Sequence, residues 1–255
     1  MSRVAVVALG GNVLVRDEAH QSIPDQYAVV EHLARHLVDL VAGGWRLVVS
    51  HGNGPQAGFI LRRSELAAHE VAPVPLDYVV GDTQGAMGYM FVKAIDNELH
   101  RRGLRRPVVA IVTRTVVDAT DPAFARPTKP VGTFLDDAVA HRLAAEHGWT
   151  IVEDAGRGWR RTVPSPAPVE ILEIDTIRAL SEAGTVVVAG GGGGIPVVRT
   201  ADGELVGVEA VVDKDLASTL IAAGIGADTL VLATGVERVA VDFGTPTQRW
   251  LDRLS

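Results

Sequence analysis

The sequence contains no cysteine among its 255 residues. Disulfide bonds, a thiolate nucleophile and cysteine-ligated metals are therefore excluded, and the composition is compatible with a reducing cytoplasm. No apolar run reaches the roughly 18 residues that a membrane-spanning helix requires. The first residues also lack the charged leader, apolar core and cleavage site of a secretory signal. We therefore expect a cytoplasmic protein with no membrane partner.

A surplus of positive charge is missing as well. The chain has 24 Lys and Arg residues against 31 Asp and Glu residues, which gives a formal net charge of −7. So acidic a chain is unsuited to bind nucleic acid broadly, and we expect no nucleic-acid partner. Binding of phosphate would need local cations and backbone amides. With 47% hydrophobic and 22% charged residues, the composition is globular, and the length suffices for one large α/β unit or two lobes.

Several common signatures of nucleotide and metal sites are absent. No glycine is followed directly by lysine, which excludes a P-loop. The run that begins at Gly52 misses the spacing of the dinucleotide fingerprint by one residue. Asp242-Phe243-Gly244 matches the magnesium tripeptide of protein kinases, but the His-Arg-Asp loop that should precede it is missing. His32 and His36 have the spacing of helix ligands, yet their charged neighbours favour a solvated face, so we predict no metal site.

Glycine, in contrast, is abundant and follows three predicted apolar strands directly. Glycine lets the backbone turn sharply and approach a ligand closely, and amide groups in such turns bind anions. Three such loops at strand ends predict a site for a highly anionic set of ligands, such as a nucleotide and a second oxyanion. Tight turns without any ligand are the alternative. The clusters are Gly10-Gly11-Asn12 after Val4–Leu9, His51-Gly52-Asn53-Gly54-Pro55 after residues 46–50, and Gly190, Gly191, Gly192, Gly193 and Gly194 after residues 185–189.

Strands alternate with helices along most of the chain, which predicts an α/β fold with an open, mostly parallel sheet and helices on both faces. In a helix expected over residues 25–42, apolar residues at helical spacing form the buried stripe, and Gly43-Gly44 ends it. A long helix is expected over 77–102, with Gly85 and Gly88 as positions where it could break. The stripe comprises Val29, Val30, Leu33, Leu37, Leu40 and Val41. Further helices are expected after Pro55 and over 171–182 and 213–223, and further strands over 107–113 and 229–233.

The stretch from Asp118 to Pro168 breaks this alternation. It contains six prolines and the turn-prone segment Asp154-Ala155-Gly156-Arg157-Gly158. We predict an inserted, protruding subdomain over 118–168 that could fold over the site, with an irregular surface excursion as the alternative. We also predict a division into a lobe of residues 1–175, which includes this insert, and a lobe of residues 176–255.

Six segments of the sequence form a more specific pattern together than any of them does alone. They are Ala8-Leu9-Gly10-Gly11-Asn12, His51-Gly52-Asn53-Gly54-Pro55-Gln56, Lys129-Pro130-Val131-Gly132, Gly156-Arg157-Gly158-Trp159-Arg160-Arg161 with Pro164-Ser165-Pro166, the glycines 190–194 with Ile195-Pro196, and residues 207–215. In order and spacing, from residue 3 to about residue 249, they resemble carbamate kinase. The lysine-bearing segments and the Gly-Arg-Gly-Trp-Arg-Arg run carry most of the specificity.

This resemblance implies the amino acid kinase fold and a cytoplasmic homodimer. It implies that the lobe of residues 1–175 binds carbamate or carbamoyl phosphate, and that the lobe of residues 176–255 binds ATP or ADP with Mg²⁺ carried by the nucleotide. The phosphoryl group would move between ATP and carbamate, in the ATP-forming direction of arginine breakdown. Carbamate kinases continue for several tens of residues beyond Ser255 and have Thr-Asp-Val where this chain has Thr234-Gly235-Val236. We therefore expect a C-terminally shortened member with an incomplete nucleotide lobe.

The resemblance also implies roles for individual residues. Lys129, kept extended by Pro127 and Pro130, would reach the transferred phosphoryl group. Lys214 would contact phosphate and Asp215 would orient the lysines, although Asp213-Lys214-Asp215 is also good capping chemistry for a helix start. The predicted substrate-binding residues are Gly10, Gly11, Asn12, Gly52, Asn53 and Gly54, and the predicted nucleotide-binding residues are Gly190, Gly191, Gly192, Gly193, Gly194 and Asp213.

Other functions stay open at this point. One is a relative that binds nucleotide or carbamoyl phosphate without turnover, in a regulatory or assembly role. Another is a sibling kinase that acts on a different acid, such as acetylglutamate or a phosphonate. The role of Arg157, Arg160 and Arg161 is open too, because a charged lid and a surface cluster around Trp159 are both compatible with the sequence.

Overall fold

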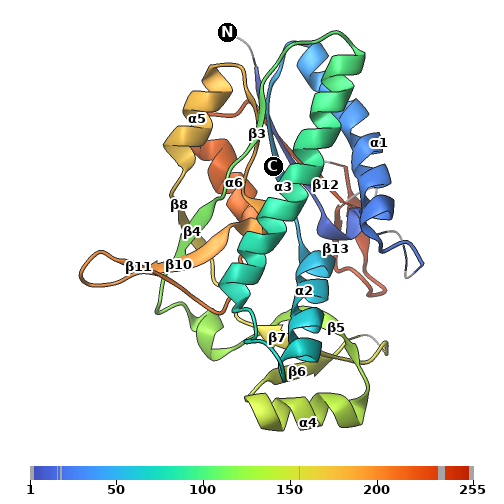
Figure 1. The fold of residues 1–255 in the computed structure, drawn as a ribbon, viewed down its shortest axis with the longest axis vertical. Helices are drawn as coiled ribbons and strands as arrows, with labels where there is room; N and C mark the ends of the chain where they lie inside the picture. The colour runs from blue at the N-terminus through green and yellow to red at the C-terminus, as the bar shows by residue number, and fades with distance from the viewer. Residues whose placement is uncertain (1–2, 16, 18, 155, 235–238, 253–255) are drawn as a thin grey trace.

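A five-stranded parallel sheet forms the centre of the molecule (Figure 1). The structure is a computed structural model, which describes residues 3–15, 17, 19–154, 156–234 and 239–252. The strand order is β12-β1-β2-β9-β3, and each pair of neighbours is parallel. The strands are β1 (Val4–Leu9), β2 (Arg46–His51), β3 (Val108–Ala110), β9 (Val186–Val188) and β12 (Thr229–Ala233). The predicted α/β fold with a mostly parallel open sheet is confirmed.

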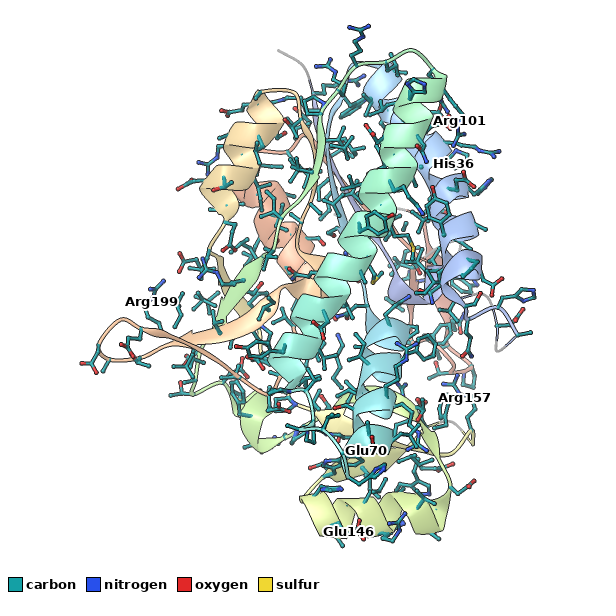
Figure 2. All side chains as sticks on the ribbon, in the orientation of Figure 1. His36, Glu70, Arg101, Glu146, Arg157 and Arg199 are labelled. Atoms are coloured by element: carbon teal, nitrogen blue, oxygen red, sulfur yellow. The ribbon has the colours of Figure 1, made fainter. Side chains whose placement is uncertain are left out.

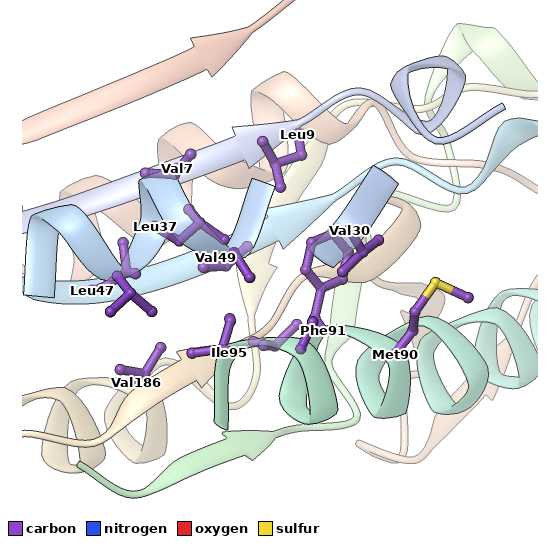
Figure 3. Packing of buried hydrophobic residues seen from close by; sticks show 14 of the residues in the cluster. Val7, Leu9, Val30, Leu37, Leu47, Val49, Met90, Phe91, Ile95 and Val186 are labelled. Atoms are coloured by element: carbon purple, nitrogen blue, oxygen red, sulfur yellow. The ribbon is translucent and has the colours of Figure 1, made fainter. Parts of the chain in front are cut away.

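The described α-helices are α1 (Ile23–Ala42), α2 (Gly54–Ala67), α3 (Leu76–Arg101), α4 (Asp137–His147), α5 (Ile174–Glu182) and α6 (Lys214–Gly224). Helices cover both faces of the sheet because successive strand residues point to opposite sides. In β1, Val7 and Leu9 belong to the core formed with α1 and α3, whereas Val4 and Val6 belong to the core formed with α5 and α6. Figure 3 shows the first of these cores, in which the ring of Phe91 lies against α1.

Ser22 fixes the beginning of α1 with a capping box. Its hydroxyl accepts the N–H of Asp25, and the carboxylate of Asp25 accepts the N–H of Ser22. The helix therefore begins two residues earlier than the predicted range 25–42, and it ends at Gly43 as expected. Within the predicted stripe, Leu33 and Leu40 are half-buried and the other members are buried.

Helix α3 runs through Gly85 and Gly88 without a break, so the suggested interruption does not occur. The two glycines lie in different surroundings. A Cβ atom on Gly88 would lie 2.8 Å from the Cβ of Ala110 in β3, whereas a Cβ on Gly85 would face open space. Gly88 therefore allows the helix to lie close to the edge of the sheet.

Two other predicted boundaries are wrong. The strand expected over 107–113 ends at Ala110, after which the chain leaves the central sheet and forms β4 (Arg114–Val117). The helix expected over 171–182 begins three residues later, because Ile171 ends β8 (Pro168–Ile171), which pairs with β4. In both places one apolar run covers the end of one element and the start of the next, which hydrophobic pattern alone does not separate.

The segment predicted as an insert is an ordered subdomain rather than an irregular excursion. It contains α4 and a three-stranded antiparallel sheet of order β5-β7-β6, with β5 (Lys129–Leu135), β6 (Thr150–Glu153) and β7 (Trp159–Val163). Figure 1 shows it projecting beyond the lower end of α2. Val131 and Val163 pack against apolar residues of α2 and α3, which docks the subdomain on the main body.

The remaining elements extend this plan. A second sheet has the order β11-β10-β4-β8, and β13 pairs with β14. The division into lobes at residue 175 stays a prediction, and strands from both sides of that position complete the central sheet. Among the described residues, no helix is both long and apolar enough to cross a membrane. The elements are β10 (Ile195–Arg199), β11 (Leu205–Gly207), β13 (Val239–Val241), β14 (Arg249–Leu251) and the 3₁₀ turns η1 (Gly11–Val13), η2 (Pro122–Ala125) and η3 (Gly191–Gly193).

His51 ends β2 as a buried imidazole with 2% of its surface exposed. Its Nδ1 lies 3.1 Å from the carbonyl oxygen of Gly52, and its ring stacks on Phe91 with 5.5 Å between the centroids. Burial lowers the pKa of His51 to about 4, an effect that the hydrogen bond to Gly52 opposes only in part. The imidazole is therefore neutral in the folded protein at neutral pH.

Replacing Gly85 and Gly88 with alanine should change the free energy of unfolding in opposite directions. Gly85→Ala should stabilise the exposed face of α3 by about 0.5–1 kcal/mol, because alanine loses less backbone entropy in a helix. Gly88→Ala should destabilise the protein by about 1–3 kcal/mol, because its methyl group would overlap Ala110. Urea unfolding measures both changes, and equal shifts would contradict the close approach of α3 to β3.

The stability of the fold should depend on pH through His51. Between the ordinary pKa of 6.5 and the folded-state pKa of about 4, the unfolded chain binds a proton at this residue and the folded chain does not. The contribution of His51 to the free energy of unfolding should therefore be complete above pH 6.5. It should be lost as the pH drops towards 4, which lowers the free energy of unfolding by about 3 kcal/mol. His51→Asn keeps a hydrogen-bond donor but cannot ionise, so it should lose this slope in urea unfolding between pH 7.5 and 4.5. Parallel pH profiles for the two proteins would argue against a neutral, buried imidazole.

Candidate active site

Most of the predicted site residues line one cavity of about 370 Å³. It lies where β1, β2 and β12 end at the same edge of the parallel sheet, which is where such sheets bind ligands. Thr234 lines it as well, while Gly235 and Val236 lie outside the described residues. The predicted residues that line the cavity are Gly10, Gly11, Gly52, Asn53, Gly54, Lys129, Gly192, Asp213, Lys214 and Asp215.

The first two glycine loops touch each other through their backbones. A Cβ atom on Gly52 would lie 2.6 Å from the amide nitrogen of Gly11, and one on Gly11 would lie 2.9 Å from that of Asn53. The Gly52 amide donates to the carbonyl of Leu9 at 2.7 Å, so Gly52 contributes its close approach rather than a free N–H. Gly54 begins α2, which directs the positive end of a helix dipole towards the cavity.

The two asparagines of these loops differ in what the structure shows. The side chain of Asn53 is buried, and its Nδ2 donates to Oγ1 of Thr83 on α3 at 2.8 Å. Thr83 in turn donates to the carbonyl of Val80 at 2.7 Å. Asn53 therefore fastens the second loop to α3 and is not simply a donor to a ligand. Asn12 lies in η1, and its side chain is outside the described part of the structure.

The run of five glycines forms a tight, buried bend behind the cavity. Backbone φ angles are positive at Gly190, Gly192, Gly193 and Gly194, a region that favours glycine. The amides of Gly190, Gly193 and Gly194 already donate to protein oxygens. Gly192 is the member that lines the cavity, and a Cβ there would overlap the side-chain amide of Asn53. The structure thus shows why the backbone must be bare here, while nucleotide binding by residues 190–194 stays a prediction.

Gln84 on α3 holds this bend in place. Its Nε2 donates to the carbonyls of Thr113 and Gly191 at 3.0 and 2.9 Å, and its Oε1 accepts the N–H of Thr113 at 2.8 Å. No spacing pattern in the sequence marks Gln84, because its partners are backbone groups remote in sequence. The one available signal was a polar residue at a core-facing position of a helix.

Lys129 reaches the cavity from the inserted subdomain and pairs with Asp213, with 3.2 Å between Nζ and Oδ2. The other oxygen of Asp213 accepts the N–H groups of Asp215 at 2.8 Å and Leu216 at 3.4 Å, which caps α6. Burial alone would raise the pKa of Asp213, but the charge of Lys129 and these hydrogen bonds outweigh it and hold that pKa below its ordinary value. One carboxylate therefore links the subdomain to the start of α6.

Lys214 and Asp215 form a second pair at the start of the same helix. Nζ of Lys214 lies 2.5 Å from Oδ1 of Asp215. Asp215 therefore lies beside Lys214, whereas Lys129 pairs with Asp213, and the predicted role of Asp215 in orienting the lysines stays a prediction. An ammonium group has three N–H donors, so each lysine keeps donors for a ligand besides its carboxylate.

Two of the three arginines in the Gly-Arg-Gly-Trp-Arg-Arg run form ion pairs within the subdomain. Arg157 and Arg160 pair with Asp154 at 3.1 and 3.0 Å, and Figure 2 shows Arg157 at the outer edge of the subdomain. These arginines hold the pKa of Asp154 below its ordinary value. None of the three lines the cavity described above, which favours the structural cluster over the charged lid.

Glu209, a residue with no predicted individual role, connects the inserted subdomain to the main body. Its Oε1 accepts the N–H of Leu76, the first residue of α3, at 2.8 Å. Its Oε2 accepts Nη2 of Arg161 in β7 at 3.2 Å. Because β7 pairs with β5, this carboxylate helps to set the position of the strand that carries Lys129.

The donor set of the cavity bears on metal binding. No group of three or more His, Cys, Asp or Glu side chains within the described ranges is placed to hold a metal ion. The carboxylates of Asp213 and Asp215 are each paired with a lysine. Such a set suits an Mg²⁺ ion that keeps phosphate and water ligands, rather than a cage of protein ligands.

Comparisons with known proteins agree with this arrangement. The model of the amino acid kinase family matches residues 3–255. The carbamate kinase-like protein YahI of Escherichia coli is 48% identical over 257 residues, which cover 100% of this chain and 81% of that protein. The carbamate kinase of Pyrococcus furiosus is 45% identical over 253 residues, 98% of this chain and 80% of its own length. The structure of Giardia lamblia carbamate kinase bound to AMP-PNP superposes with a TM-score of 0.88 at 37% identity, covering 98% of this chain and 79% of that one. The chain therefore belongs to the amino acid kinase family, among the carbamate kinases and their carbamate kinase-like relatives.

Proposed function

We propose that this protein transfers a phosphoryl group between ATP and carbamate, so that ATP and carbamate interconvert with ADP and carbamoyl phosphate. The observation that carries the proposal is the meeting of Lys129 and Lys214, from two distant segments, in one cavity with the glycine loops of β1 and β2. Two ammonium groups and a helix N-terminus provide the positive charge that an overall acidic chain needs in order to hold phosphate. The carbamate kinases among the relatives favour carbamate as the acceptor.

Phosphoryl transfer needs little covalent help from a protein. The attacking and leaving oxygens lie in line, and negative charge spreads over the oxygens of the transferred group. Catalysis then consists of positioning and of charge stabilisation by preorganised donors. Asp213 and Asp215 hold Lys129 and Lys214 in the cavity before any ligand enters, so the ammonium groups need little rearrangement.

The two sides of the cavity suggest which substrate lies where. The loops at Gly10-Gly11 and Gly52-Asn53-Gly54 are small and closely apposed, which suits the carboxylate end of carbamate or carbamoyl phosphate. Gly192 and the start of α6 lie on the side assigned to ATP or ADP, whose bound Mg²⁺ would offset phosphate charge. We also propose, from the family resemblance, a cytoplasmic homodimer that works in the ATP-forming direction of arginine breakdown.

Lys129→Ala and Lys214→Ala should each slow the formation of ATP from ADP and carbamoyl phosphate by about 10²–10³-fold, the usual cost of removing one preorganised donor. A luciferase-coupled assay measures the rate. Arg105→Ala removes an exposed cation outside the cavity and serves as the control, with an unchanged rate. Full activity in both lysine variants would reject the assigned roles.

Asp213→Asn should separate the electrostatic role of Asp213 from its capping role. Asparagine is a good helix cap, so the free energy of unfolding should change by less than about 1 kcal/mol. The loss of the charge facing Lys129 should still lower the rate about tenfold or more, because the ammonium group is no longer held in position. Asp213→Ala, which removes the cap as well, should lower both stability and rate. An unaltered rate in Asp213→Asn would show that the pair is only structural.

The competing functions give different outcomes in the same experiments. A rise in Tm with ADP or carbamoyl phosphate, without any turnover, would indicate a binding relative in a regulatory or assembly role. Faster ADP release with acetylglutamate or a phosphonate than with carbamate would indicate a sibling kinase. Turnover that prefers carbamate would exclude both.

A further inference from the structure

Lysine is rare in this chain, and its few positions are informative. The sequence has three lysines against 21 arginines. Lys129 and Lys214 line the candidate active site, which leaves one lysine without a role. That residue, Lys93, lies half-buried on α3 and lines a different cavity.

This second cavity lies between α1, α2 and α3 and has a volume of about 380 Å³. It shares no lining residue with the active-site cavity. Its size falls in the range of about 300–1,000 Å³ that is typical of small-molecule sites. Its wall is largely apolar and aromatic, and includes Tyr27, Phe59, Ile60, Met87, Tyr89 and Met90.

The ammonium group of Lys93 is held over two aromatic rings at this cavity. Nζ lies 3.7 Å from the ring centroid of Tyr27 and 5.4 Å from that of Tyr89. Within the described ranges, no carboxylate forms an ion pair with Lys93 or with Arg63, an exposed cation that lines the same cavity. Two cations beside an apolar wall, without an anionic partner from the protein, are complementary to an anionic ligand.

Gln56 adds a second unsatisfied group to the cavity wall. It is 8% exposed, and its Nε2 donates to Oε1 of Gln26 at 3.0 Å. Gln26 is itself fixed by a hydrogen bond to the carbonyl of Gln21 at 2.8 Å. Oε1 of Gln56 is buried and has no hydrogen-bond partner among the residues that the structure describes. Buried acceptors are normally satisfied, so this oxygen indicates a donor that an occupant would supply.

We propose that this cavity is a second ligand site, for an organic anion with an apolar ring-sized body and an N–H or O–H donor. Lys93 binds the anionic group, with Arg63 at the exposed side. The aromatic wall packs against the apolar part of the ligand, and Oε1 of Gln56 accepts a hydrogen bond from the ligand's N–H or O–H group. The site adjoins the loop of Asn53, because Thr83 lines this cavity and accepts the hydrogen bond from Asn53.

8-Anilinonaphthalene-1-sulfonate is a suitable probe, because it combines aromatic rings, a sulfonate and an N–H donor. Its fluorescence on titration with the full chain should show saturable binding. Lys93→Gln should weaken the affinity about tenfold or more, through the loss of a charge-assisted hydrogen bond, and Lys93→Arg should largely retain it. Ala86→Trp, on the exposed rim of the cavity, should abolish binding by filling the space. Arg105→Gln is the matched loss of a cation outside the cavity and should leave the affinity unchanged.

Three results would overturn the proposal. The first is unchanged affinity in Lys93→Gln and Ala86→Trp, with native far-ultraviolet circular dichroism. The second is strictly competitive displacement of the probe by ADP, with an apparent Kd for the probe that keeps rising in proportion to the ADP concentration, which would place the probe in the active-site cavity. The third is a shift of Ala86→Trp from dimer to monomer in sedimentation, because a second copy of the chain would then cover the cavity. None of these readouts requires turnover, so the proposal stands or falls separately from the kinase activity.

Discussion

The backbone contact between Gly11 and Gly52 sets the geometry on which the rest of the site depends. These loops follow neighbouring strands of the parallel sheet, and their approach leaves no room for a Cβ on either residue. Behind them, Gly192 lies against the side chain of Asn53 under the same constraint. The shape of the cavity at these loops is therefore set by main chain, which preorganises it. The cost is entropic, because glycine loses more conformational freedom on folding than other residues do. The edge of the parallel sheet places the loops next to each other, and glycine allows their backbones to come into contact.

The charged side chains of the cavity come from two parts of the chain, whereas the glycine loops carry no charge. Asp213 and Lys214 come from the start of α6, within the main body, whereas Lys129 comes from the inserted subdomain. The location of Lys129 thus depends on how the subdomain is docked, through Val131 and Val163 in an apolar contact and through Glu209 in a polar one. The polar contact fixes direction and the apolar contact supplies most of the association free energy. A substitution that loosens the docking would therefore move a charge in the active site without touching the site itself.

Much of this architecture follows from local pattern in the sequence. The strands β1, β2 and β12, the start of α6 and the glycine loops are marked by apolar runs with breakers beside them, so they could be predicted. The sheet within the insert could not be predicted, because its strands are mostly half-exposed or exposed and give weak periodicity. Gln84 and Glu209 were missed for another reason. Each binds backbone groups that lie far away in sequence, so no characteristic spacing between residue types marks the interaction in the sequence.

The bond between Asn53 and Thr83 is the point where the two cavities of the molecule meet. Asn53 lines the first cavity and Thr83 lines the second, and their side chains are joined at 2.8 Å inside the protein. Gln56, the third residue of α2, lines the second cavity, while Gly54, the first residue of that helix, lines the first. Thr83 and the start of α2 are therefore the contacts through which the second cavity adjoins the loop that touches Gly11. Thermodynamic linkage makes any coupling through this bond reciprocal: if a ligand in one cavity changes affinity in the other by some factor, a ligand in the second cavity changes affinity in the first by the same factor.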